Sequence, residues 1–267
     1  MNKAEIDIQI ILSTDELWFL MSQFSPAYVI GMENPHTGWL IEEIEEADRN
    51  AIQALIQKGI VKIIDAGIID IDDTIASLIR GCTHPEHSLI VNVSNEKGNA
   101  GLTRYIHFAN GLIIEHVEIE AGRHQLSLLK NRNAILTQFK ENLRLDSKTK
   151  GTIDSFLILE ELLYKVTNLC SQGDGEKGKA LLQKSDLEPV HATALADALE
   201  NPVANASFVI ICNQNDPSTQ HVGGFGILES EKQLWMMHPI ERAGQPFVEF
   251  TPADAKSVRK HFIEILP

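Results

Sequence analysis

Paired carboxylates lie early in the chain in an Asp-x-Asp-x-Thr pattern, formed by Asp70, Asp72 and Thr74. The pattern follows the apolar pair Ile68-Ile69 and precedes a segment with helical spacing. In such a pair, one carboxylate can attack phosphorus while the other acts as acid and base. The pattern is therefore typical of a phosphatase-like hydrolase that uses Asp70 and Asp72.

The residues around this pattern favour a different interpretation. The pattern resembles the nucleophile loop of haloacid-dehalogenase-type phosphatases, and residues 91–95 resemble the second motif of that family, a strand ending in Ser or Thr. That fold needs parallel strands alternating with helices, whereas residues 88–129 contain short alternating runs that favour antiparallel hairpins. We therefore predict that Asp72 or Asp73 caps a helix, and we keep the hydrolase as an alternative function.

Two other patterns contain part of a zinc site and part of a phosphate-binding loop. Cys82, His84 and His87 have the side-chain types of zinc ligands, but they lie in one short segment with no second Cys/His cluster nearby in sequence. Residues 173–180 fit the GxxxxGK part of a phosphate-binding loop, but Ala180 replaces the Ser or Thr that would hold Mg²⁺. We predict no catalytic residue, no cofactor and no metal.

The run Trp235, Met236 and Met237 could serve recognition instead of chemistry. Consecutive residues of a strand point to opposite faces, so this strand is apolar on both sides. Burial of both faces in a core is the first interpretation. The second is a Met/Trp surface that binds a partner, because adaptable protein-binding surfaces are rich in these side chains.

The composition excludes several classes of protein. With 23 Lys and Arg against 37 Asp and Glu, the formal net charge is −14, which disfavours binding to nucleic acid or to anionic membranes. No apolar run reaches the ~18 residues that span a bilayer, which indicates no membrane insertion. Three scattered cysteines and a charged N-terminal segment indicate reduced thiols and a cytoplasmic protein.

The elements that must position these residues occur twice in the same order. Residues 112–143 and 234–266 each read as strand, glycine turn, strand and amphipathic helix, and a shift of 122 positions pairs Gly122 with Gly244. Two further segments repeat at similar shifts: 54–58 with 180–184, and 88–91 with 207–210.

The repeats predict an α+β fold of two similar halves with quasi-twofold symmetry, in which helices flank antiparallel sheets. We place the halves at 1–145 and 151–267, separated by the polar stretch 146–151. Within the second half, the spacing predicts a long helix over 153–169, a loop over 173–178 and a final helix over 253–265.

Several short segments resemble the EspG family of chaperones for type VII (ESX) secretion. Residues 12–18 (LSTDELW) look like its opening helix, and residues 54–61 (ALIQKGIV) are similar to a helix end of that family, with Lys58 where arginine is usual. Trp235 and Pro239, ahead of the final helix, resemble its tryptophan-to-proline strand.

The resemblance implies a quasi-twofold α+β fold and a non-enzymatic role. Members of the family bind secreted PE–PPE protein pairs in the cytosol and keep them soluble for export, so a helical protein client is the implied partner. The sequence also leaves open a regulatory domain that binds a small molecule between the two halves.

Overall fold

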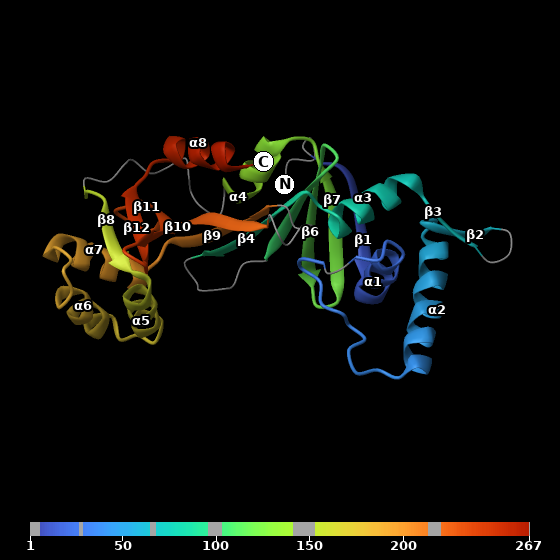
Figure 1. Ribbon diagram of the computed structural model, residues 1–267, viewed down its shortest axis with the longest axis horizontal. Coiled ribbons are helices and arrows are strands. Elements are labelled where there is room, and N and C mark those ends of the chain that lie inside the picture. Colours follow the sequence, from blue (N-terminus) through green and yellow to red (C-terminus); the bar gives the residue numbers. More distant parts are fainter. Residues whose placement is uncertain are drawn as a thin grey trace. The chain divides into compact units, whose positions relative to one another are not determined.

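The computed structural model describes residues 6–26, 29–64, 68–95, 103–140, 153–212 and 220–266. The chain forms two compact units (Figure 1). The first unit comprises Met1–Ile90, Leu102–Ala134 and Ile210–Val222, and the second comprises Val91–Gly101, Ile135–Val209 and Gly223–Pro267.

The elements follow one another along the chain in two series. The first series is β1 (Ile6–Ser13), α1 (Thr14–Ser22), α2 (Ile41–Gln57), β2 (Val61–Ile64), β3 (Ile68–Ile71), α3 (Asp73–Thr83), β4 (His87–Asn95), β5 (Arg104–Ala109), β6 (Leu112–Glu120), β7 (Arg123–Leu129) and α4 (Arg132–Lys140). The second series is β8 (Phe156–Leu159), α5 (Glu160–Ser171), α6 (Gly175–Gln183), α7 (Pro189–Glu200), β9 (Ala204–Cys212), β10 (His221–Glu229), β11 (Leu234–Arg242), β12 (Gln245–Pro252) and α8 (Ala255–Ile265).

Each unit arranges its strands in the same order. The order is β1-β7-β6-β5-β4 in the first unit and β8-β12-β11-β10-β9 in the second, so the first strand of each series lies beside its last strand. The pairs β1/β7, β6/β7, β11/β12 and β12/β8 are antiparallel. The fold is thus α+β, with antiparallel strands flanked by helices. Common strand order does not establish a duplication, and the quasi-twofold symmetry stays a prediction.

The two predicted glycine turns have the same backbone geometry. Gly122 joins β6 to β7 with a φ of 73°, and Gly244 joins β11 to β12 with a φ of 74°. Glycine adopts this left-handed conformation without the steric cost that a Cβ brings. The division into 1–145 and 151–267 stays a prediction as well, because residues 141–152 lie outside the described part of the chain.

Helix α1 begins with a capping box formed by Ser13 and Glu16. The Ser13 hydroxyl accepts a hydrogen bond from the Glu16 N–H at 3.2 Å, and Glu16 Oε2 accepts one from the Ser13 N–H at 2.7 Å. Lys58, which follows α2, reaches the same carboxylate with its Nζ at 2.6 Å. The end of α2 is thereby joined to the start of α1.

Each unit has its own apolar core. In the first unit, α1 packs on β1 and β7, α3 packs on β5 and β6, and α2 packs on α1 (Figure 1). In the second, α5, α6 and α7 pack together, and α5 lies against β8 and β12. The largest fully buried side chains include Leu17, Leu55 and Ile79 in the first core and Trp235 and Phe250 in the second.

Three predicted elements were wrong. The long helix over 153–169 is strand β8 followed by α5, because Phe156 and Ile158 face the core in alternation and β8 pairs with β12. Helix α6 begins at Gly175, inside the predicted loop. The last helix begins at Ala255 with Asp254 as its cap, and Pro252 ends β12. None of the helices in the described residues is long and apolar enough to cross a membrane.

Candidate partner-binding surface and polar cleft

Strand β11 holds the sequence-predicted recognition residues mostly inside the protein. The Trp235 side chain is fully buried in the core of the second unit, where its ring lies edge-on to Phe250 with centroids 6.4 Å apart. Met236 is buried and Met237 is partly buried. This burial matches the first interpretation of the run. A role for Trp235, Met236 and Met237 in partner binding stays a prediction, and burial makes Trp235 unsuitable as a direct contact.

A separate two-stranded hairpin, β2–β3, lies in the first unit (Figure 1) and carries exposed isoleucines. Ile64 pairs with Ile68 and Ile63 with Ile69 across this hairpin. Ile63, Ile64 and Ile68 are 57%, 49% and 59% exposed. Exposed apolar side chains that gather in one place often mark a binding site on a soluble protein. Ile64 and Ile68 share one face of the hairpin and Ile63 lies on the other, and we call Ile63, Ile64 and Ile68 together the isoleucine surface.

The base of this hairpin is fixed to the body of the unit. Val61 is buried in the first core, and the Asp72 N–H donates to the Ile60 carbonyl at 3.0 Å. These two contacts fix the hairpin that carries the isoleucine surface to the rest of the unit. The sequence does not predict this hairpin, because residues 60–64 indicate a strand or an extended link and residues 70–80 indicate a helix.

The paired carboxylates have two separate structural roles. Asp70 lies on β3 opposite Lys62 and is exposed. Asp72 caps α3: its Oδ1 accepts from the Thr74 N–H at 3.0 Å and from the Ile75 N–H at 3.2 Å. The predicted capping role is confirmed for Asp72. The strands that pair around this motif are antiparallel, unlike the parallel sheet in which a phosphatase nucleophile loop sits.

The residues of the zinc-like pattern and of the glycine-rich stretch 173–180 have ordinary structural contacts. Cys82 lies in the core on α3, where burial raises the pKa of its thiol, while the His84 ring contacts the Thr83 hydroxyl at 2.9 Å. No group of three or more metal-binding side chains gathers within the described residues. Lys177, in the glycine-rich stretch, pairs with Asp174 at 2.8 Å.

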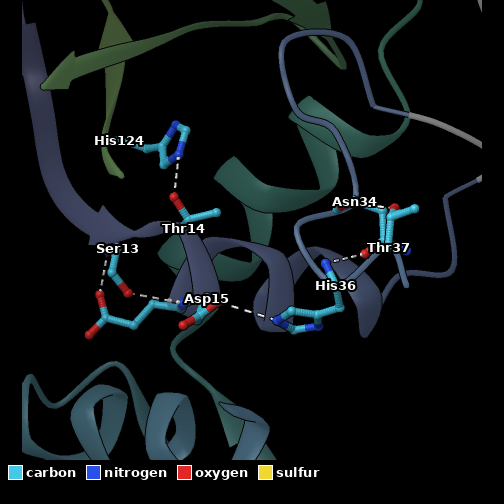
Figure 2. Close-up of polar contacts among 8 residues, drawn as sticks. Ser13, Thr14, Asp15, Asn34, His36, Thr37 and His124 are labelled. Atoms are coloured by element: carbon cyan, nitrogen blue, oxygen red, sulfur yellow. Dashed lines mark hydrogen bonds and ion pairs between the residues drawn. The ribbon is translucent and has the colours of Figure 1, made fainter. Parts of the chain in front are cut away.

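A line of polar side chains runs from α1 into the sheet of the first unit. The Thr14 hydroxyl lies 3.1 Å from Nε2 of His124 on β7 (Figure 2). Nδ1 of His124 lies 3.0 Å from Nε2 of His116 on β6. On neighbouring β5, His107 Nδ1 meets the Ser88 hydroxyl at 2.9 Å. His107, His116 and His124 are all buried.

Burial decides the charge of these imidazoles. It lowers the pKa of His107 to about 4. Burial also lowers the pKa of His116 to about 3, with smaller contributions from His107 and His124. Burial lowers the pKa of His124 too, against the opposing effect of the Glu118 carboxylate. Histidines with such environments are neutral at pH 7, because the charged form loses its hydration.

The outer end of this line opens into a cleft. The cleft has a volume of about 600 Å³ and is lined by Thr14, His124, Tyr105 and the loop 29–33. Gly31 in this loop lies against the Tyr105 ring so closely that an added Cβ would sit 2.4 Å from a ring carbon. The loop therefore needs glycine at this position.

Comparison with known proteins finds similarity in fold but not in sequence. No family model matches the sequence, and no curated protein is similar to it in sequence. Among solved structures, the fold matches the Mycobacterium tuberculosis type VII secretion system chaperone EspG5, solved in complex with a PE25–PPE41 dimer. The match has a TM-score of 0.65 at 11% sequence identity and covers 97% of each chain. At this identity, the likeness establishes that the chain has an EspG-like fold over its whole length.

Proposed function

We propose that this protein is a non-enzymatic chaperone or adaptor that binds a helical protein partner and keeps it soluble for secretion. The observation that carries the proposal is the full-length EspG-like fold, since the matched chaperone was solved with a bound PE–PPE dimer. A cytosolic location and a secreted, PE–PPE-like client are the finer parts of the same proposal.

The isoleucine surface is the part of the chain that we assign to the partner. Its three side chains stand on a hairpin whose flanking charges, Lys62 and Asp70, lie opposite each other in the register. These exposed apolar side chains suit contact with the apolar side chains of a helix in the partner. A second copy of this chain is a poor occupant, because a net charge of −14 on each molecule opposes self-association.

Burial of the isoleucine surface would supply a useful share of the binding energy. A fully buried isoleucine contributes about 1.5–3 kcal/mol relative to an exposed one. Part of any such gain is offset by the loss of freedom on association. We therefore expect the hairpin to act as the apolar centre of a larger contact.

The test is site-specific photo-crosslinking in the native host, with the crosslinker at position 64 and a matched control at the exposed Tyr164. The proposal expects one helical protein, or one protein pair, to crosslink from position 64. The purified partner should then form a stoichiometric complex with the chain and should aggregate without it. A partner that stays soluble alone, or crosslinks equal at both positions, would overturn the proposal.

A further inference from the structure

The cleft beside Thr14 is a preformed site with two anchored walls. One wall is the loop 29–33, which Gly31 seats on the Tyr105 ring. The same loop is held again further along, where His36 Nε2 meets Asp15 Oδ1 at 3.2 Å (Figure 2). Thr14 and Asp15 are neighbours on α1, so the first turn of this helix contacts both the sheet and the loop.

The rim of the cleft carries negative charge. Glu33 comes from the loop and Glu118 from β6, and both are exposed. Glu118 Oε1 accepts a hydrogen bond from the Gly122 N–H at 2.8 Å, which fixes the direction of its carboxylate. Among the described residues that line the cleft, none is a lysine or an arginine.

The pKa of the Tyr105 phenol is affected by the same two carboxylates. Burial raises the pKa of Tyr105, and the carboxylates of Glu118 and then Glu33 raise it further. Both carboxylates are therefore close enough to the phenol to disfavour a second negative charge there.

An anion would find little to bind at the start of α1. The Thr14 N–H donates to the Gly122 carbonyl at 3.1 Å, and the Glu16 N–H donates to the Ser13 hydroxyl. These two donors, which often bind anions at a helix start, are already occupied. The Thr14 hydroxyl keeps a free lone pair whichever nitrogen of His124 carries the proton, because a hydroxyl has two acceptor positions.

The cleft also has apolar lining. Ile30, Ile90 and Ile211 line it alongside the polar groups. Apolar lining together with carboxylates matches the build of a lysine or arginine side chain, which buries its alkyl stem and keeps its charged end near polar groups.

We propose that this cleft binds the cationic end of an alkyl chain, an ammonium or guanidinium group held by Glu33, Glu118, the Tyr105 phenol and the Thr14 hydroxyl. The cation can belong to a small free amine or to a lysine or arginine side chain of another protein. The proposal does not depend on the isoleucine surface, because the cleft is complete within the first unit.

The test is an NMR titration of the whole chain with n-butylammonium and n-butylguanidinium, and with n-butanol as the neutral control. We expect saturable shifts of the amide signals at 31–33 and at Thr14, with a Kd on the order of 1 mM for so small a ligand. Nα-acetyl-lysine amide and Nα-acetyl-arginine amide carry the backbone of a protein residue and therefore separate the two sources. If they bind as tightly as n-butylammonium and n-butylguanidinium, the cleft accepts a protein side chain. If they bind more weakly, the cleft is suited to a small free amine.

Three variants decide whether the cleft itself is responsible. Glu118→Gln and Glu33→Gln each should weaken binding about 2- to 5-fold, as expected for an exposed ion pair. Glu231→Gln, on the exposed surface of the second unit, should change nothing. Equal binding of n-butanol, shifts that do not saturate, or unchanged binding by the Glu33→Gln/Glu118→Gln double variant would overturn the proposal. The Gln variants keep the acceptor oxygen toward Gly122, so the fold should persist.

Discussion

Strands β6 and β7 of the first unit bury polar side chains, whereas β11 and β12 of the second unit bury aromatic ones. The buried polar residues of the first hairpin are Glu115, His116, His124, Gln125 and Ser127. In the second hairpin, the large buried side chains are Trp235 and Phe250, and the Phe250 ring stacks on Phe156 of β8 at 4.9 Å. Two hairpins with the same turn geometry and strand order therefore hold together by different physical means.

The difference has an energetic consequence. An aromatic core is stabilised by removing apolar area from water, in rough proportion to that area. A buried polar network gains little net energy, yet it loses a great deal when one partner is removed, because the remaining group stays buried and unpaired. The stability of the second hairpin should therefore fall when a large buried side chain is shortened. The stability of the first should fall when a hydrogen-bond or ion-pair partner is removed, or when the pH is lowered.

The largest effect is expected from Trp235→Ala. Removing a fully buried indole leaves a cavity and should lower the free energy of unfolding by about 3–5 kcal/mol. Trp39→Ala is the matched control, because Trp39 is 46% exposed, and it should change the value by less than about 0.5 kcal/mol. Urea unfolding followed by far-UV circular dichroism measures both, and similar losses in the two variants would contradict the assigned core.

In the first hairpin, the strongest effect should come from breaking an ion pair. Arg104 Nη1 lies 2.7 Å from Oε1 of Glu115, whose side chain is fully buried. Arg104→Met should cost about 3 kcal/mol, because it leaves a buried carboxylate without its cation. The double variant Arg104→Met/Glu115→Met should recover most of this loss in the same urea experiment. A double variant less stable than the single one would refute the argument.

The buried histidines should make the first unit sensitive to acid. In the folded state the pKa of His116 is lowered to about 3 and that of His107 to about 4, against 6.5 for an ordinary histidine. The unfolded chain then binds more protons between these values, so stability is fully present above pH 6.5 and falls as the pH drops below it.

Each such histidine should cost up to about 1.4 kcal/mol per pH unit within this window. Urea midpoints at pH 7.5 and 5.5 measure the slope. His116→Gln should reduce it, even if the variant is less stable at both pH values. His238→Gln in the second unit should reduce the slope less than His116→Gln does, because His238 is only partly buried and burial lowers its pKa less. A slope that His116→Gln does not alter would show that other groups control it.

The smallest effects are expected at the helix caps, where the two units are alike. Asp72 caps α3 and Asp254 caps α8, the latter through a 2.6 Å bond from the Ser257 N–H. Asp72→Ala and Asp254→Ala should each cost about 1 kcal/mol in urea unfolding. Asp70→Asn, which removes an exposed charge without a cap, should stay within about 0.5 kcal/mol. A larger loss for Asp70→Asn than for Asp72→Ala would contradict the capping assignment.

Local patterns predicted much of this fold because they depend on neighbours in sequence. The strand, glycine turn and strand over 112–129 follow from period-two alternation around Gly122. The caps at Ser13 and Asp72 follow from residue type and spacing. Strand β8 was missed because its four apolar residues continue into the leucines of α5, so the run also satisfies helical spacing.

The candidate surfaces could not be read from the sequence for a different reason. An isoleucine looks the same whether it is buried, as Ile79 is, or exposed, as Ile64 is. Only the tertiary fold separates the two. The cleft likewise joins Thr14, Tyr105 and His124 from three elements distant in sequence, and no short motif marks such a group.

The affinity of the purified partner for a hairpin variant tests the central claim most directly. Ile63→Thr/Ile64→Thr/Ile68→Thr removes the isoleucine surface and keeps the β-branched side chains that favour a strand. Tyr164→Gln/Val190→Thr is the control, since both residues are exposed on helices of the second unit. Calorimetric titration should give a Kd raised at least about 10-fold by the first set and unchanged by the second. An unchanged Kd for the triple variant would contradict the account.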